Sequence, residues 1–201
     1  MGVITIYDYL LLPLYITLFY YIARIYSKKF YAEGLGKFYT TGFWLRMGGA
    51  VLYSLVVQYY YGYGDSFIYY GGGELLRTAA ADNGFFSTFF LKATELSKIA
   101  NSYSIGAYTE GTMAIESNLT VMRASAILSF FSFHCYMIIA LFMGFYSFVG
   151  SWKLFYTFNE IMGKKTPKLL AYVVLYAPSM WFWGSGLLKE SLCMGALGLL
   201  V

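Results

Sequence analysis

The stretch ASAILSFFSFHCYMIIALFMGFYSFV, residues 124–149, decides the fold class. It contains no Asp, Glu, Lys or Arg, and His134 is its one basic side chain. A helix that crosses the hydrocarbon core of a bilayer needs about 20 mostly apolar residues. We therefore expect one membrane-spanning helix over residues 122–149, with His134 hydrogen-bonded inside a helix bundle.

The rest of the chain is apolar in the same way. Of its 201 residues, 59% are hydrophobic and only 12% are charged, whereas a typical soluble domain has about 25% charged residues. Three further segments are expected to span the membrane, over residues 4–23, 43–61 and 169–183, and Arg46 is expected to extend from the second of them to the membrane surface. The expected fold is all-α: a polytopic helical membrane protein of four or five transmembrane helices, forming a single transmembrane domain over residues 1–201.

A last apolar run covers residues 187–201 and is still apolar at the final residue. Because no polar flank follows it, we expect that this span is truncated and that the chain is the N-terminal part of a longer protein. The alternative is a short final helix that packs against the others.

The distribution of Lys and Arg predicts the orientation. These residues are dense in the connections 24–46 and 150–168 but sparse in the much longer connection 62–121, which is rich in acids. Connections rich in Lys and Arg stay in the cytoplasm, so residues 62–121 are expected to form one long external loop. Apolar stripes at helical spacing in this loop predict amphipathic helices that lie in the membrane interface, or a lid that only packs; the stripes are Leu75, Leu76 and Ala79, and Phe85, Phe86, Phe89 and Phe90.

Two classes of function have little support in the sequence. No basic run interleaved with aromatic residues is present, so nucleic-acid binding is not expected. With one histidine and no Cys-x-x-Cys or His-Glu-x-x-His pattern, no metal site is expected, and dependence on a divalent metal stays open.

The stretch YYYGYGDSFIYYGGG, residues 59–73, places Asp65 among aromatic residues and glycines just after an apolar run. A carboxylate at the boundary between lipid and water can act as a base. Tyr69 and Tyr70 offer rings for stacking on sugars and hydroxyls for hydrogen bonds. The alternative is a solvated loop acid between interfacial tyrosines.

A second group lies in PSMWFWGSGLLKES, residues 178–191. Lys189 and Glu190 open an apolar run, where ionisable groups are costly unless they are paired or functional. Lys189 suits a phosphate, and so does Arg123 at the start of the 122–149 run. The alternatives are a Lys–Glu pair in a short hairpin and an arginine that extends to lipid headgroups.

These residues resemble a known family. The Gly-Asp element GDSFIYY, residues 64–70, resembles the first external loop of GT-C-type polytopic glycosyltransferases and of EpsG-like bacterial surface-polysaccharide polymerases. The segment at 178–191 and GSWKLF, residues 150–155, are similar to segments of related bacterial membrane proteins. Members of the family usually have more spans, and their catalytic acid often follows the first helix rather than the second.

The resemblance implies a transferase in the bacterial cytoplasmic membrane, with the 62–121 loop periplasmic or extracellular. Its substrates would be a polyprenyl-phosphate-linked sugar donor and a glycan acceptor, with membrane lipid and other polysaccharide-assembly proteins as partners and no certain cofactor. Asp65 would be the catalytic base, and Arg123 and Lys189 would contact the phosphate.

Two other functions remain open. One is a non-catalytic multi-pass subunit of a polysaccharide export or secretion assembly, which would tolerate Asp65→Asn. The other is a transporter, which would favour ionisable groups at the middle of the membrane rather than at one face.

Overall fold

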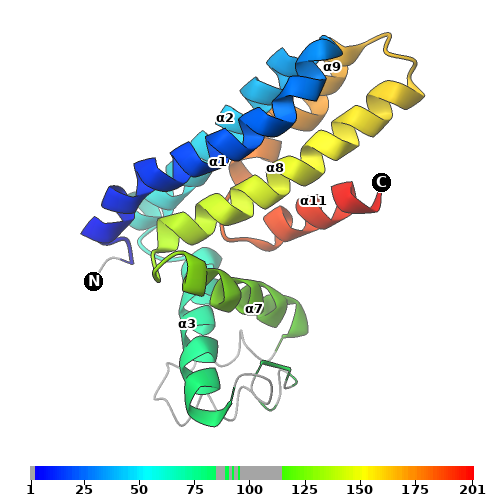
Figure 1. Ribbon diagram of the computed structural model, residues 1–201. Coiled ribbons are helices and arrows are strands. Elements are labelled where there is room, and N and C mark those ends of the chain that lie inside the picture. The colour runs from blue at the N-terminus through cyan, green and yellow to red at the C-terminus, as the bar shows by residue number, and fades with distance from the viewer. Residues whose placement is uncertain (1–2, 85–88, 91, 93–94, 96–114) are drawn as a thin grey trace.

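The computed structural model describes residues 3–84, 89–90, 92, 95 and 115–201, and every regular element in this part of the chain is a helix (Figure 1). The expected all-α fold is thereby confirmed. The long elements are α1 (Ile6–Ala32), α2 (Gly36–Val56), α3 (Asp65–Asn83), α7 (Glu116–Phe131), α8 (Tyr136–Ile161) and α11 (Lys189–Leu200). The short ones are α9 (Pro167–Ala171), α10 (Pro178–Trp183) and the π-helical turns η1 (Val57–Tyr61) and η2 (Tyr172–Tyr176).

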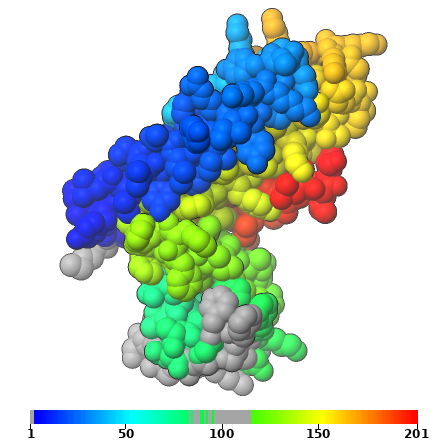
Figure 2. All heavy atoms as spheres, in the orientation of Figure 1, coloured from blue at the N-terminus to red at the C-terminus, as the bar shows by residue number. Residues whose placement is uncertain are grey.

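These helices form two groups. α8 packs against α1, α2 and α11, and together they make an elongated bundle. α3 and α7 pack against each other and project from one end of the bundle, as Figure 2 shows. The hydrophobic core accordingly runs the length of the bundle and continues into the α3–α7 pair.

Two helices of the described part, α1 and α8, are long and apolar enough to cross a membrane. They differ in burial. In the most apolar 18-residue segment of each helix, 72% of the α8 residues but only 22% of the α1 residues are buried in the protein. α8 is therefore the central helix of the bundle, and α1 leaves an apolar face on the surface. By length and composition the helices support two crossings, fewer than the expected four or five.

The expectation of one helix over residues 122–149 is wrong. α7 ends at Phe131 and α8 begins at Tyr136. Between them Phe133 and His134 have φ angles of 52° and 62°, in the left-handed region that a right-handed helix cannot include.

Asp8 supplies the physical reason for this break. Its buried carboxylate belongs to a capping box at the start of α1, where it accepts hydrogen bonds from the backbone and side chain of Thr5 at 2.8 and 2.9 Å. The second carboxylate oxygen accepts a hydrogen bond from the Met137 N–H at 2.8 Å. Amides in the first turn of a helix lack partners within the helix, so Asp8 favours a new helix start at this point, 129 positions along the chain.

Part of the expected external loop, residues 62–121, is also helical, because α3 and the first turns of α7 fall within it. Leu75, Leu76 and Ala79 lie on α3 as expected, but they are buried inside the protein rather than in a free interface. Gly73 lets α7 approach closely, since a Cβ there would lie 2.6 Å from Ser125 Oγ. Of the second stripe, Phe85 and Phe86 lie outside the described residues.

The expected span 169–183 is interrupted at Ala177, and Pro178 begins the separate short helix α10. Proline suits the first position of a helix but cannot continue one. Residues 184–188 then form a buried, non-helical segment, which we call the buried link. α11 follows at Lys189, within the expected run 187–201.

The buried link passes between α2 and α8, and glycines on both helices make room for it. A Cβ at Gly49 of α2 would lie 2.9 Å from Ser185 Oγ, and a Cβ at Gly144 of α8 would lie 3.2 Å from the Ser185 carbonyl oxygen. The absence of a side chain at these two positions therefore allows the link to lie inside the bundle.

Candidate functional site

A cavity of about 430 Å³ lies where η1, the start of α3 and the start of α11 meet. Four of the six residues expected from the sequence to form a site line it: Asp65, Tyr69, Lys189 and Glu190. The rest of its lining is mostly aromatic and apolar: Tyr53, Val56, Val57, Tyr61, Tyr63, Gly64, Phe182, Trp183 and Leu188.

Asp65 is placed by a tight turn between η1 and α3. Gly62 and Gly64 have φ angles of 69° and 148°, a region that residues with a Cβ rarely adopt. The turn makes Asp65 the first residue of α3, where the partial positive charge of the helix N-terminus favours a carboxylate. Its side chain is exposed at the edge of the cavity, so it is accessible to a substrate.

Tyr69 follows Asp65 by one helical turn and lies on the same face of α3. It is only 3% exposed, and its hydroxyl donates to Asn118 Oδ1 at 3.2 Å. Burial, and then the negative charges of Asp65 and Glu190, raise the pKa of Tyr69 to about 12. The phenol therefore keeps its proton at neutral pH and remains a neutral hydrogen-bond donor.

Lys189 and Glu190 enter the cavity from the first turn of α11. The Lys189 ammonium donates to Ser117 Oγ at 3.0 Å and so links α11 to the start of α7. In the described part of the chain, this amine is the one basic group that lines the cavity. A carboxylate, an ammonium and a neutral phenol thus face a common space that aromatic rings enclose.

Arg46 holds the buried link that presents Lys189, and its expected position at the membrane surface is wrong. Its side chain is 1% exposed. One terminal nitrogen donates to Ser147 Oγ and to the Gly184 carbonyl, both at 2.7 Å, and the other donates to Ser151 Oγ at 2.6 Å. Arg46 faces α8 and the link rather than lipid because these three acceptors lie inside the bundle and bind both terminal nitrogens, while the buried Nε has no hydrogen-bond partner among the described residues.

The aromatic wall of the cavity includes residues that the sequence did not single out. The Tyr53 ring packs against Phe182 and Trp183 at centroid distances of 5.5 and 6.0 Å. Gly186 allows this arrangement, since a Cβ there would lie 2.5 Å from the Tyr53 ring. Aromatic residues beside glycines in the stretches 59–73 and 178–191 could have indicated an aromatic wall. They do not identify Tyr53, which precedes the first of these stretches and lies on α2.

Tyr70 and Arg123, the other two expected site residues, do not line the cavity. Tyr70 follows Tyr69 directly, and consecutive helical residues point about 100° apart, so its hydroxyl donates instead to the His134 carbonyl at 2.6 Å. Arg123 forms an ion pair with Glu116 at 3.9 Å along α7.

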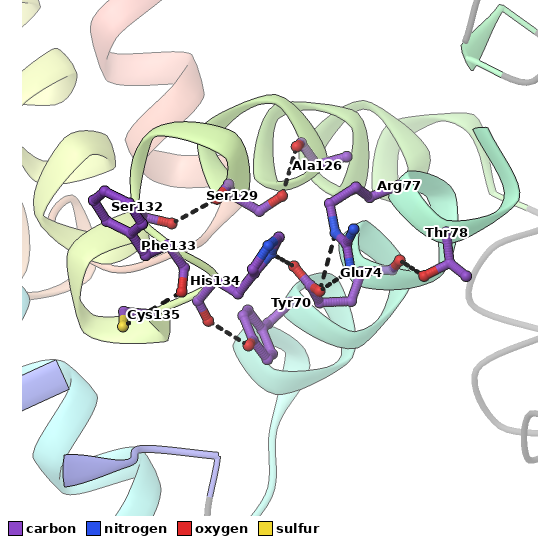
Figure 3. A network of polar contacts seen from close by, with 10 residues as sticks. All are labelled: Tyr70, Glu74, Arg77, Thr78, Ala126, Ser129, Ser132, Phe133, His134 and Cys135. Carbon is purple, nitrogen blue, oxygen red and sulfur yellow. Dashed lines mark hydrogen bonds and ion pairs between the residues drawn. The ribbon is translucent and has the colours of Figure 1, made fainter. Parts of the chain in front are cut away.

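A polar network joins α3 to the break between α7 and α8 (Figure 3). Glu74 accepts from Arg77 at 3.1 Å, and its other oxygen lies 3.2 Å from His134 Nδ1. The sequence predicts His134 inside a helix bundle, and this prediction is wrong, because His134 lies at an exposed break between two helices. With the Tyr70 bond, the network fixes α3 against the start of α8 and so fixes the wall that carries Asp65.

Among the described residues, no three His, Cys, Asp or Glu side chains gather as a metal ion would require. No protein-family model, curated protein or solved structure matches the chain significantly.

Proposed function

We propose that this chain is a polytopic membrane glycosyltransferase, similar to polysaccharide polymerases, that acts at the outer face of a bacterial cytoplasmic membrane. It would transfer a sugar from a polyprenyl-phosphate-linked donor to the hydroxyl of a glycan acceptor. The observation that carries the proposal is the cavity that brings the Asp65 carboxylate and the Lys189 ammonium together between aromatic walls.

The apolar surface of α1 supports the membrane location. Its exposed large side chains recur along the helix and include Leu10, Leu14, Leu18, Tyr21 and Ile25. Soluble monomers rarely expose a continuous apolar surface of this length, whereas a lipid-facing helix requires one.

The charges at the two ends of the bundle support the orientation. Lys28, Lys29 and Lys37 lie around the α1–α2 turn, and Lys164 and Lys165 lie around the α8–α9 turn at the same end (Figure 1). The cavity is at the opposite end, where α3 begins. Because basic connections remain in the cytoplasm, the cavity would face the outside.

The proposed reaction uses the charged groups of the cavity in defined roles. Asp65 accepts the proton of the acceptor hydroxyl, and the resulting oxygen nucleophile forms a bond to the anomeric carbon of the donor sugar. The bond between that carbon and the phosphate oxygen breaks, and its electron pair leaves with the lipid phosphate. Lys189 stabilises the charge that develops on this leaving group, and the aromatic wall stacks against the sugar.

Replacement of Asp65 tests the proposal. In a host strain that lacks the gene, we expect Asp65→Asn to lower glycan transfer at least about a hundredfold and to cause lipid-linked donor to accumulate, because the amide cannot take the proton. Surface glycan and lipid-linked sugar are measured at matched protein levels in the membrane. Asp82→Asn, on the same helix but outside the cavity lining, is the matched control and should retain transfer.

A non-catalytic subunit of a polysaccharide export or secretion assembly is the second candidate. Four exposed tyrosines beside the cavity favour it, because exposed aromatic surface suits a protein partner; they are Tyr59, Tyr60, Tyr61 and Tyr63. Normal glycan levels with Asp65→Asn would rule out the transferase and favour this subunit.

A further inference from the structure

A second cavity, of about 470 Å³, lies between α1 and α2 near the turn that joins them. Its lining comes entirely from these two helices: Tyr20, Ala23, Arg24, Ser27, Lys28, Tyr31, Tyr39, Thr40 and Phe43. The α1–α2 turn lies at the other end of the bundle from the start of α3, which carries Asp65 (Figure 1), and the proposed transfer reaction gives the second cavity no role.

The charge of this cavity is positive. Arg24 and Lys28 lie four residues apart on α1, so they project from one face of the helix. Among the residues that the structure describes, no Asp or Glu lines the cavity with them. The Arg24 guanidinium donates to the Tyr20 hydroxyl at 3.2 Å, which orients it beside the cavity. Two adjacent cations without a carboxylate between them form a site for an anion.

Polar groups and an aromatic ring lie close to the two cations. Tyr31 and Thr40 join the two helices near the turn through a hydrogen bond of 2.9 Å between their hydroxyl oxygens. Tyr20 lies one helical turn from Arg24 on the same face of α1 and lines the cavity. A ligand with a charged head beside an apolar part would match this arrangement, because the head would meet the cations while the apolar part contacts the Tyr20 ring.

We propose that the cavity between α1 and α2 binds the phosphate group of an anionic membrane phospholipid. Arg24 and Lys28 hold the phosphate, and the Tyr20 ring contacts the glycerol and the first acyl carbons. Basic pockets between helices on the cytoplasmic side of a membrane suit such headgroups. The site shares with the proposed function only its membrane location, and it is independent of Asp65.

The test uses the full chain purified in a nonionic detergent. Binding of phosphatidylglycerol and of phosphatidylcholine is titrated and read by native mass spectrometry. We expect Arg24→Gln with Lys28→Gln to weaken phosphatidylglycerol binding at least about tenfold, because each basic side chain adds to the attraction of an anionic headgroup. Phosphatidylcholine should bind weakly to every variant, and Asp65→Asn should bind phosphatidylglycerol like the unmodified protein.

Lys29→Gln with Lys37→Gln is the matched control. It removes the same charge from the same end of the bundle, but neither residue lines the cavity. The Lys29 ammonium lies instead over the Tyr156 ring, 5.7 Å from its centroid. We expect this pair to change phosphatidylglycerol binding less than about twofold.

Three outcomes would overturn the proposal. Equal losses in the two double variants would mean that diffuse surface charge attracts the lipid. Equal binding of the two lipids would mean that the cavity does not recognise the anionic headgroup. Displacement of phosphatidylglycerol by millimolar inorganic phosphate, with the same dependence on Arg24 and Lys28, would assign the cavity to a soluble phosphate.

Exchanging the pair as Arg24→Lys with Lys28→Arg retains both charges, so this variant should still bind phosphatidylglycerol even if the neutral variant folds poorly.

Discussion

Arg46→Ala is expected to lower the free energy of unfolding by about 4 kcal/mol, the largest loss we expect from a single truncation in this chain. The change removes three charge-assisted hydrogen bonds and leaves the Gly184 carbonyl and Ser151 without their partner inside the bundle. The truncation also leaves a void inside the bundle, because the long Arg46 side chain that fills this space is only 1% exposed. Because Gly184 begins the buried link, the variant should loosen the segment that presents Lys189 to the cavity.

Equilibrium unfolding in mixed detergent micelles measures this loss. Lys37→Ala on the same helix removes the same charge from an exposed position, and it should change the stability by no more than about 0.5 kcal/mol. The loss of stability in Arg46→Lys should lie between those of Arg46→Ala and Lys37→Ala, because one ammonium cannot replace two guanidinium nitrogens that donate to separate acceptors. If Arg46→Ala were as stable as Lys37→Ala, the arginine would not hold the link.

Gly150→Leu is expected to destabilise the protein by about 3 kcal/mol or more by separating α11 from α8. A Cβ at Gly150 would overlap the Met194 carbonyl oxygen and would lie 2.6 Å from the Gly195 Cα. On the other helix, a Cβ at Gly198 would overlap the Gly150 carbonyl. These obstacles are backbone atoms, so the helices themselves must move apart.

The matched control for this prediction is Gly48→Leu on α2, where a Cβ would have nothing within 4 Å. That change should be neutral or slightly stabilising, since leucine favours a helix over glycine by roughly 0.8 kcal/mol. Unfolding in mixed micelles measures the change in stability, and the spin–spin distance between labels on α8 and α11 measures the separation of the two helices. An unchanged distance together with unchanged stability in Gly150→Leu would contradict the close packing of the two helices.

The sequence predicted the helical class and much of the cavity, because both depend on local patterns. Apolar runs predict helices wherever they are long enough. The distribution of Lys and Arg predicts one external side for Asp65 and the Lys189–Glu190 pair, and the structure brings these residues to one cavity. Tyr69 joins them because it is one helical turn from Asp65.

The sequence did not predict features that depend on contacts between distant residues. Nothing near Phe133 and His134 indicates a break, because Asp8 favours it from the start of the chain. Arg46 looks like an ordinary interfacial arginine until Ser147, Ser151 and Gly184 are found around it. Tyr69 and Tyr70 are adjacent residues of the same type, so the sequence does not distinguish their roles. Only the positions of α7 and α8 around α3 do.

The hydrogen bond between Asp8 and Met137 has a consequence for the order of assembly. Residue 137 leaves the ribosome long after residue 8, and a contact across so much chain forms only after both segments have been made and brought together. Until then the run 124–149 has only its own apolar pattern to direct it, and that pattern favours one continuous helix. We therefore expect the division into α7 and α8 to be completed late in folding, when α1 docks.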